Sequence, residues 1–443
     1  MRVEQALAVA GVGTNDPSRE MKLQIALARS LMYTRDTVIP ELGAGWSKAD
    51  AALTSALELA ESLEDVEYQL RALRGLWAFH RTERRPRVAL ALAERIDSLA
   101  VGRSDPNDRL IGQRLIGVSL HFLGDQQSAR DRLQATVADF VMPSNRSGRI
   151  RFQLDGQVQA YLCLARILWL QGFPDQAMRT AERSIEEARA INHANSLCSA
   201  LARAACPIAM LVGDLAAAEE YTTMLVDYAR RHALALWRAY GCTYQGLLAS
   251  ERGDAVGGLQ LMRTGLGGPG RSKPAVLRLI TLFMSKALED EEIVAGLDAL
   301  EEEIESCETT EEYWMIAELL RMKGELMLMQ AASGEVTAAE DCFRRALDWA
   351  RRQGALSWEL RAAMSLTRLQ RKQAGWAEAA AVLRAVYDRF TEGFETADLK
   401  AAKALLAAGG QVHSETAMRP AHRSVTACSD LARAIALFSL LSR

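Results

Sequence analysis

Residues Leu154 to Ile191 read LDGQVQAYLCLARILWLQGFPDQAMRTAERSIEEARAI. Apolar residues recur at three- and four-residue spacing in the first part of this stretch, which predicts a helix with one apolar stripe. Gly172 is predicted to end that helix, because glycine readily adopts positive φ. Pro174 is predicted to begin a second helix, because the first helical position needs no N–H donor. The apolar residues of the second helix again share one face. The stretch therefore predicts two amphipathic helices joined by a tight turn.

The same glycine-containing turn recurs along the chain between amphipathic segments. It occurs at intervals of 48, 41, 40, 81 and 41 residues, at Gly124, Gly172, Gly213, Gly253, Gly334 and Gly375. The interval of 81 residues corresponds to two periods, with a missing turn expected near Asp290. A period of about 40 residues built from helix, turn and helix predicts an all-α, right-handed superhelical solenoid. Its units would be antiparallel, tetratricopeptide-like helix pairs, about nine in number.

This pattern divides the chain into five segments. They are a lead and loop (1–20), a first set of helical repeats (21–264), a Gly/Pro-rich loop (265–274), a second set of repeats with a capping helix (275–407), and a disordered tail with a short apolar helix (408–443). Pro207 stands inside a helical segment of the first set. We expect it to kink that helix, because proline removes a backbone hydrogen bond.

The composition is that of a folded globular protein. Hydrophobic residues make up 49% and charged residues 25% of the 443 residues, with a net charge of −3. A nearly balanced charge gives no electrostatic reason to expect direct binding to nucleic acid or to an anionic membrane. The seven cysteines form no C-x-x-C pair, which favours buried thiols in a reducing cytosol over a zinc site. The best apolar window, Ala204 to Gly213, is too short to cross a bilayer. The sequence therefore predicts a cytoplasmic protein.

The common catalytic motifs are absent from the sequence. The nearest approach to a phosphate-binding loop, Gly267 to Lys273, has the wrong spacing and no strand before it. No H-E-x-x-H occurs, and the six histidines never pair at metal-ligand spacing. Gly117 to His121 lacks the last glycine of a nucleophile elbow. The sequence therefore predicts no catalytic, cofactor-binding or metal-binding residues, and the protein is not expected to be an enzyme.

Large aromatic and arginine side chains lie on the first helices of several predicted pairs. Such helices often line the concave groove of a solenoid, where these side chains anchor a peptide or small ligand. The alternative interpretation is that most of the aromatic residues belong to the core. The candidate groove residues are Arg114, His121, Arg151, Arg203, Trp237, Arg238 and Tyr244.

A second candidate surface is acidic. Residues 289–318 contain many carboxylates and no Lys or Arg, including the run Glu301, Glu302 and Glu303. One interpretation is a solvated helix face. The other is a patch that binds a basic partner through an interaction sensitive to salt.

Several longer phrases resemble a known family. They are RLIGVSLHFLGDQQSAR (114–130), ARILWLQGFPDQAMRTA (165–181), AELLRMKGEL (317–326), FRRALDWARRQGALSWELRAAMSLTRL (343–369) and YDRFTEGFETADLKAAKALL (387–406). Together they resemble the C-terminal tetratricopeptide-like region of bacterial signalling ATPases. Those proteins are winged-helix transcriptional regulators or class III adenylate cyclases, with an effector domain, then a predicted P-loop ATPase, then this repeat region. The resemblance covers about 21–406 and departs from the family pattern at 265–300 and after 409.

The resemblance implies a non-catalytic, ligand- or protein-binding module of a signalling or transcriptional regulator. A ligand in the groove would favour one curvature of the array, and a P-loop ATPase and effector, in cis or in trans, would respond to that curvature. ATP hydrolysis and DNA binding are not implied, because no residues here match those motifs. The alternative is a free-standing scaffold that recruits protein partners without an effector of its own.

Overall fold

The computed structural model describes residues 16–32, 42–103, 106–139, 150–151, 154–254, 257–258, 260–262, 290–330, 335–371 and 375–408. The loop predicted at 265–274 and the tail predicted after 408 lie outside these residues. The turn expected near Asp290 is not found from that residue onward, because Asp290 is the first residue of a helix, and the residues just before it lie outside the described part of the chain. We refer to the described residues up to 262 as the first half and to those from 290 onward as the second half.

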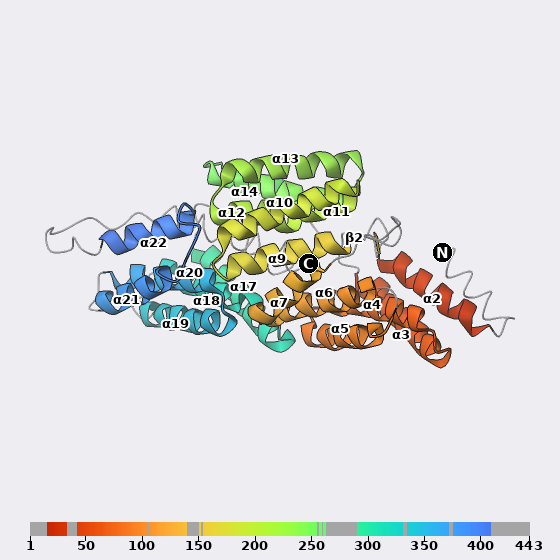
Figure 1. The fold of residues 1–443 in the computed structure, drawn as a ribbon. Coiled ribbons are helices and arrows are strands. Elements are labelled where there is room, and N and C mark those ends of the chain that lie inside the picture. Colours follow the sequence, from red (N-terminus) through yellow and green to blue (C-terminus); the bar gives the residue numbers. More distant parts are fainter. Residues whose placement is uncertain are drawn as a thin grey trace, which may run out of the picture.

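The first half consists of antiparallel helices that follow one another in space as they do in sequence (Figure 1). They are α2 (Pro17–Met32), α3 (Leu42–Ser62), α4 (Val66–Thr82), α5 (Pro86–Ala100), α6 (Pro106–Leu123), α7 (Gln126–Ala138), α9 (Gly156–Leu170), α10 (Pro174–Ala190), α11 (Ala194–Ala200), η1 (Leu201–Ala205), α12 (Cys206–Val212), α13 (Leu215–Arg231) and α14 (Ala235–Glu251). A two-residue antiparallel hairpin, β1 (Ile150–Arg151) and β2 (Leu154–Asp155), precedes α9.

The second half continues the same pattern. It contains α17 (Asp290–Thr310), the 3₁₀ turn η2 (Tyr313–Met315), α18 (Ile316–Gln330), α19 (Glu335–Gln353), α20 (Leu356–Gln370), α21 (Trp376–Tyr387) and α22 (Ala397–Ala408). The structure therefore confirms the predicted all-α solenoid of antiparallel helix pairs.

Two kinds of turn join the helices. The predicted glycine turns within pairs have positive φ at Gly124, Gly172, Gly213 and Gly253. Four turns between pairs place a non-glycine residue at positive φ, namely Glu64, Asn192, Ala233 and Glu311. Two other turns between pairs have Gly102 and Gly354 at positive φ, and the α4–α5 turn within a pair has Arg84. The second kind was not predicted, because non-glycine residues adopt positive φ only where the surrounding packing compensates for the strain.

The N-terminal boundary of the helical array differs from the prediction. Helix α2 begins at Pro17, whereas the sequence analysis placed residues up to 20 in a loop. The carboxylate of Asp16 accepts hydrogen bonds from the N–H groups of Ser18 and Arg19, at 3.1 and 3.2 Å. Asp16 therefore caps the helix, and Pro17 occupies the first position, where its missing N–H costs nothing.

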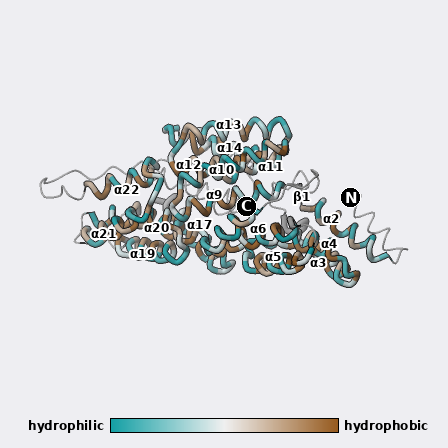
Figure 2. The backbone as a smooth tube through the Cα atoms, in the orientation of Figure 1, coloured by the Kyte–Doolittle hydropathy of each residue, from teal (hydrophilic) through white to brown (hydrophobic). Residues whose placement is uncertain are grey.

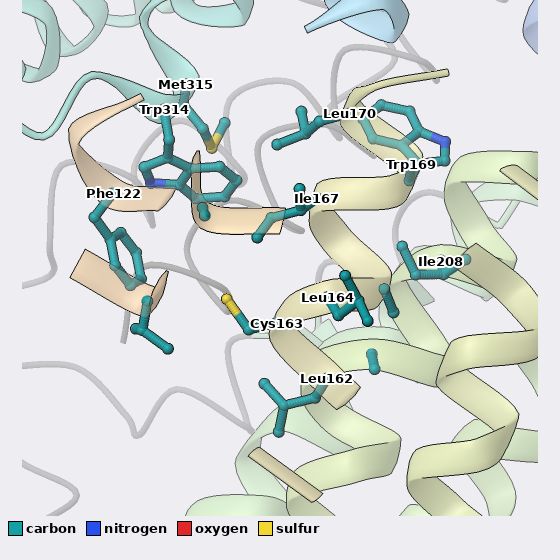
Figure 3. Packing of buried hydrophobic residues seen from close by; sticks show 14 of the residues in the cluster. Phe122, Leu162, Cys163, Leu164, Ile167, Trp169, Leu170, Ile208, Trp314 and Met315 are labelled. Atoms are coloured by element: carbon teal, nitrogen blue, oxygen red, sulfur yellow. The ribbon is translucent and has the colours of Figure 1, made fainter. Parts of the chain in front are cut away.

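Helix α9 forms the centre of the core. Every residue from Leu162 to Leu170 is buried, and Figure 3 shows its side chains lying between Phe122 and Trp314 on one side and Ile208 on the other. Most other helices have hydrophobic residues on one side and hydrophilic residues on the other (Figure 2).

The helix is not interrupted at Pro207, where the sequence predicts a kink. The five residues Leu201–Ala205 form the π-helical segment η1, and the Cys206 N–H donates to the Leu201 carbonyl, five residues earlier. Pro207 then lies in the first turn of α12, where it needs no N–H donor. The extra residue in the π turn therefore accommodates the proline within one continuous helical path.

This continuous helical segment also bears on whether the chain has a helix that could span a membrane. Ala194–Val212 is long and apolar enough to cross a membrane by length and composition, but 83% of it is buried inside the protein, as in a core helix.

The predicted burial of the thiols is confirmed for five of the six cysteines in the described residues; Cys242 is partly exposed.

The two halves lie side by side, because the second half folds back across the turns of the first (Figure 1). The turns at Gly124, Gly172 and Gly213 lie against Gln353, Leu356 and Ala397 respectively. We call this row of first-half turns, including the α4–α5 turn at Arg84, the turn edge. Contacts across it join residues about 200 positions apart, such as the hydrogen bond from the Ser357 hydroxyl to the Trp169 carbonyl.

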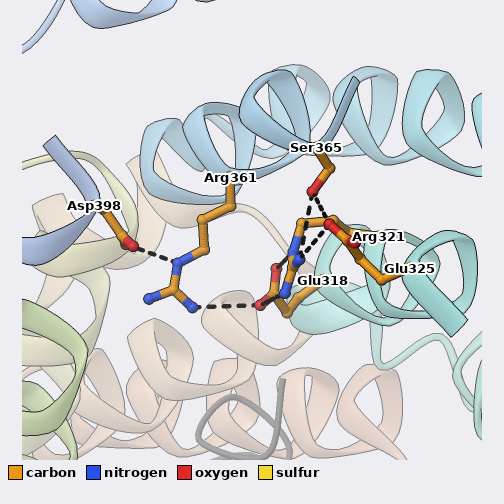
Figure 4. A network of polar contacts seen from close by, with 6 residues as sticks. All are labelled: Glu318, Arg321, Glu325, Arg361, Ser365 and Asp398. Atoms are coloured by element: carbon orange, nitrogen blue, oxygen red, sulfur yellow. Dashed lines mark hydrogen bonds and ion pairs between the residues drawn. The ribbon is translucent and has the colours of Figure 1, made fainter. Parts of the chain in front are cut away.

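A buried ionic network stabilises the second half internally (Figure 4). Glu318 on α18 accepts from Arg321, at 2.8 and 2.9 Å, and from Arg361 on α20, at 3.3 Å. Arg361 also donates to Asp398 on α22, at 2.7 Å. Glu318 is 0% exposed, so the network ties three helices together around one carboxylate that water does not reach.

Candidate functional site

Three arginine side chains from different helices lie near enough for their charges to interact. They are Arg81 on α4, Arg166 on α9 and Arg203 on η1, and we call them the arginine cluster. Arg166 is buried, whereas Arg81 and Arg203 are half-buried. Burial lowers the pKa of Arg81 to about 10, and the neighbouring charge of Arg203 acts in the same direction; Glu312 opposes it and Arg166 adds to it.

Aromatic rings surround the cluster. The guanidinium carbon of Arg81 lies 5.4 Å from the centre of the Phe122 ring, and that of Arg166 lies 5.8 Å from the same ring. Arg166 is also 5.9 Å from the Trp314 ring, and Arg203 is 5.5 Å from the Trp237 ring. These distances are within the range of cation–π interactions, so the rings hold the guanidinium groups in place.

Tyr240 carries a buried hydroxyl group on a ring whose centre lies 5.4 Å from that of Trp237. Its side chain interacts electrostatically with Arg81, its residue is 4% exposed, and the hydroxyl has no hydrogen-bond partner among the described residues. By contrast, the hydroxyl of nearby Tyr244 donates to the Ala202 carbonyl. A buried hydroxyl without a partner is costly in a folded protein, so Tyr240 offers an unused donor to a ligand.

The arginine cluster lies at the junction of the two halves. Trp314, in contact with Arg166, belongs to η2 of the second half. Glu312, which acts on Arg81, also accepts from Arg84 of the turn edge. A change at the arginine cluster would therefore act directly on contacts between the halves.

The structure brings two of the predicted groove residues together. Arg203 lies against Trp237, whose indole N–H donates to the Asn195 side chain. Arg238, the next residue along α14, is exposed. Arg151 lies on β1, and its side chain is outside the described part of the structure.

Arg114 occupies a separate position. It is half-buried on α6, and burial lowers its pKa to about 10, against the opposing effect of Asp155. It lies beside the start of α9, with its Nε 3.8 Å from the position that a Cβ on Gly156 would occupy. Arg114 therefore lies near helix α9, which also carries Arg166, but at the opposite end of that helix from Arg166.

Two predicted groove residues are core residues instead. His121 and Tyr244 are both 0% exposed, so neither presents a surface to a ligand. The Nδ1 of His121 is 2.8 Å from the Gln126 side-chain oxygen, and burial lowers its pKa to about 3, with Arg166 adding to the effect. His121 is therefore neutral and packs between Phe122 and Trp314, each ring centre 5.1 Å away.

The predicted acidic patch is also smaller than expected. Glu301 and Glu302 are exposed, and Glu301 pairs with Lys323 at 2.6 Å. Glu303 is 5% exposed and pairs with Arg84 of the turn edge at 2.8 Å. The run of three glutamates spans nearly one helical turn, so its third member points inward. Binding of a basic partner by Glu301 and Glu302 stays a prediction.

The sequence analysis did not include Arg81 and Arg166 among the candidates. A usable signal existed for Arg166, which is the lone charge in the otherwise apolar segment LCLARILWL (162–170). Arg203 is likewise isolated in SALARAACPIAMLV (199–212). A single arginine in a helix that is apolar on all sides must have a polar environment inside the fold, which marks it as a candidate functional residue.

A shallow hollow of about 370 Å³ lies elsewhere, between α7, α9 and α10, and is lined by residues such as Val137, Tyr161 and Arg179. It does not include the arginine cluster. Among the described residues, no group of three His, Cys, Asp or Glu side chains is placed to hold a metal ion.

No protein-family model matches this chain, and no curated protein matches it. Among solved structures, a Rap protein complexed with competence and sporulation factor is 11% identical, with a TM-score of 0.39 over 89% of this chain and 99% of that one. A Signal Transduction ATPase with Numerous Domains (STAND) protein with a tetratricopeptide repeat sensor, from Pyrococcus horikoshii, is 12% identical. That alignment has a TM-score of 0.33 and covers 91% of this chain and 64% of that chain. At these scores the similarity carries no information about ligand or mechanism.

Proposed function

We propose that this chain is a non-catalytic binding module that holds a protein or peptide segment at the arginine cluster and serves as the sensing part of a signalling regulator. The observation that supports this most directly is the convergence of arginine and aromatic side chains at the junction of the two halves. Arginine and aromatic residues dominate binding energy in protein interfaces, because they combine large contact area with directed hydrogen bonds.

The position of the cluster suggests how binding is transmitted. A ligand that contacts Arg81 and Arg166 competes with their present interactions, which involve Glu312 and Trp314 of the second half. Binding would therefore favour one arrangement of the halves over another, which is a population shift. An ATPase and an effector, covalently attached or associated, would respond to the favoured arrangement in a bacterial cytoplasm.

Selection of peptides from a random library against the purified chain tests the binding function. We expect enriched peptides whose affinity falls about tenfold or more when Arg203 is replaced by Ala, because a charge-assisted contact is lost. The matched control is Arg230→Ala on α13, whose side chain is 73% exposed and pairs with Asp227. Failure to enrich any peptide, or enriched peptides that bind the Arg203→Ala protein unchanged, would contradict the proposal.

The size of the native polypeptide tests the regulatory part. An immunoblot of the source cells with an antibody to this chain should give a band well above the 48.7 kDa of the present sequence if the effector is covalently attached. If the effector is associated instead, an ATPase should be recovered in the same complex. A band at that size, with no ATPase recovered in the same complex, would instead favour a free-standing scaffold.

A further inference from the structure

The hollow between α7, α9 and α10 is a feature that the proposed function does not use. Its volume is about 370 Å³, which lies within the range of ligand pockets in proteins. Figure 1 shows α9 between α7 and α10, so α9 forms the floor of the hollow and the other two helices form its walls. We call this hollow the α7–α10 groove and define it by Val137 on α7, Leu164 and Leu168 on α9, and Arg179 and Arg183 on α10.

A short helix borders the groove. Helix α7 has 13 residues, whereas α10 and α13, the next second helices of the array, have 17 each. The missing residues make α7 about 6 Å, or one turn, shorter. Val137 lies in the last turn of α7, so the groove extends to the place where this wall ends.

The groove and the arginine cluster lie on opposite faces of α9. Leu164 and Leu168 are one turn apart and line the groove together. Arg166 is two residues from each of them, which is about 200° around the helix axis. The groove is therefore a separate surface, and binding there is independent of the proposed function.

The floor of the groove is apolar. Leu164 and Leu168 are 4% and 3% exposed, and the partly exposed side chains of Val137 and Tyr161 lie beside them. An apolar side chain that enters the groove leaves water and contacts these residues, which is favourable. A whole helix is about 10 Å across and does not fit in this volume, so only side chains of a partner enter.

One wall of the groove is basic. Its described lining includes the two arginines of α10 and no carboxylate. Arg183 pairs with two glutamates of its own helix, each at 2.9 Å. Arg179 is exposed and has no ion-pair partner among the described residues. Glu182, at the spacing of a helix neighbour, instead accepts from the Tyr221 hydroxyl at 3.2 Å. A carboxylate next to an apolar side chain therefore complements this wall.

We propose that the α7–α10 groove docks an amphipathic, acidic helix of a partner protein. The groove runs along α9 from Tyr161 to Leu168, about 10 Å, which accommodates two leucine-sized side chains one helical turn apart. A glutamate or aspartate beside them pairs with Arg179. The apolar contacts supply most of the affinity, because an exposed ion pair contributes little, and the ion pair selects acidic over basic partners.

Calorimetric titration of the full chain with synthetic helices tests the proposal. The probe is an amidated peptide of about 15 residues, with leucines at helical spacing on one face and glutamates beside them. Three further peptides replace its leucines by Ala, its glutamates by Gln, or its glutamates by Lys. We expect the probe to bind, the Gln peptide to bind about threefold more weakly, the Lys peptide more weakly still, and the Ala peptide not at all.

Charge reversal locates the ion pair. Arg179→Glu should weaken binding of the probe about fivefold and make the Lys peptide the tighter ligand of the two. A purely structural role of Arg179 would not exchange this preference. Arg189→Glu is the matched control, because Arg189 is an exposed arginine of the same helix that does not line the groove. It should leave the probe the tighter ligand.

Bulky substitutions locate the apolar contacts. Val137→Trp and Thr180→Trp fill the groove from opposite walls. Each should weaken binding of the probe about tenfold or more, because less apolar surface is buried. Arg203→Ala, in the arginine cluster, should leave binding of the probe unchanged. Circular dichroism melting shows whether each variant is folded, and Arg179→Glu, at an exposed position, supplies the reading if a tryptophan variant does not fold.

Several results would overturn the inference. They are no binding of the probe, equal binding of the Ala peptide, undiminished binding in both tryptophan variants, an equal response to the two charge reversals, or loss of binding in the Arg203→Ala protein. A dimer of the free chain that Val137→Trp dissociates would show that a second copy occupies the groove, and the inference would also fail. If library selection yields no peptide that depends on Arg203, the proposed function fails and docking in the groove is unaffected.

Discussion

Gly172 is constrained in two ways at once. Its φ is +85°, where residues with a Cβ are strained. A Cβ at this position would also lie 2.6 Å from the Leu356 side chain and 3.0 Å from Phe390. The sequence predicts the first constraint, because the glycine follows a helix. It cannot predict the second, because Leu356 is far away in the chain.

Substitution of Gly172 by Ala should therefore lower the free energy of unfolding by more than backbone strain alone. We expect a loss of about 2–3 kcal/mol, combining about 1–2 kcal/mol of strain with the displacement of packed side chains. Gly354 is the matched control, because its φ is +64° but nothing lies within 4 Å of its Cβ position. Gly354→Ala should cost about 1 kcal/mol. Urea denaturation of both variants measures the difference, and equal losses would show that the turn edge does not press on Gly172.

Side-chain roles were harder to predict than backbone roles. The apolar pattern of each helix identifies which face is buried, but it does not distinguish a ring that packs in the core from a ring that lines a site. Tyr244 and Tyr240 are one turn apart on α14 and both are buried. Tyr244 finds a carbonyl acceptor and Tyr240 does not. That difference depends on Ala202, which belongs to another helix.

Among whole elements, the buried network of α18, α20 and α22 gives a prediction with a defined pH dependence. Burial alone would raise the pKa of Glu318, but Arg321 and Arg361 outweigh it, so the pKa lies below the ordinary value for a glutamate. A carboxyl whose folded-state pKa is lowered contributes stability above its unfolded pKa and loses it as pH falls through the folded value. The contribution of Glu318 should therefore be complete at neutral pH and decline in acid.

Glu318→Gln should lower the free energy of unfolding by about 3–5 kcal/mol at neutral pH, because it removes the buried carboxylate that Arg321 and Arg361 share. The difference in the free energy of unfolding between the wild type and the variant should begin to narrow below about pH 4.5 and should close as pH falls through the lower folded-state pKa of Glu318, where the wild-type side chain is also protonated. Urea titrations across this pH range measure the gap. Asp227→Asn, which breaks an exposed ion pair on α13, should cost about 0.5 kcal/mol or less. A constant gap at all pH values would contradict the assigned role of Glu318.

The sequence predicts the ends of a helix correctly where a glycine or proline marks them locally. Pro174 and Gly172 marked the α9–α10 turn correctly. For Pro207 the local rule predicts a kink from a lost hydrogen bond, and it does not predict the π turn that the preceding residues form. The rule describes the cost of a proline in a regular α-helix, and the chain avoids that cost by adding a residue.

For the whole molecule, the packing of the two halves is the property that the sequence did not predict. Repeat periodicity fixes contacts between successive helices, since these are local. Contacts across the turn edge, such as the two hydrogen bonds from Gln176 to Glu392 at 2.9 and 3.0 Å, join residues 216 positions apart. No pattern in either segment identifies the other as its partner.

Arg84 should be the most important single residue of this interface. It donates to Glu312 and pairs with Glu303, and both carboxyls have raised pKa values, because burial outweighs the opposing effect of Arg84. Arg84→Met should lower the free energy of unfolding by about 3–5 kcal/mol at neutral pH, because two carboxylates stay buried without their cation. A carboxyl with a raised folded-state pKa favours folding as pH falls, so about pH 5 should recover part of the loss.

The control for Arg84 lies three residues away. Arg87 pairs with Glu311 across the same interface but is 66% exposed, so Arg87→Met should cost less than about 1 kcal/mol. Urea denaturation at pH 7 and pH 5 compares the two variants. Similar losses for both, or no recovery of the Arg84→Met protein in mild acid, would contradict the importance assigned to the buried pair.

The turn edge has a consequence for how this protein can evolve. Open arrays of helical repeats gain and lose units by duplication and deletion, because each unit contacts only its neighbours. Here the turns at Gly124, Gly172 and Gly213 each meet a particular residue of the second half. A unit inserted among them would shift every later turn out of register with its partner. These contacts therefore fix the number of helix pairs in the first half. Length variation among descendants of this chain should be confined to positions outside the paired turns.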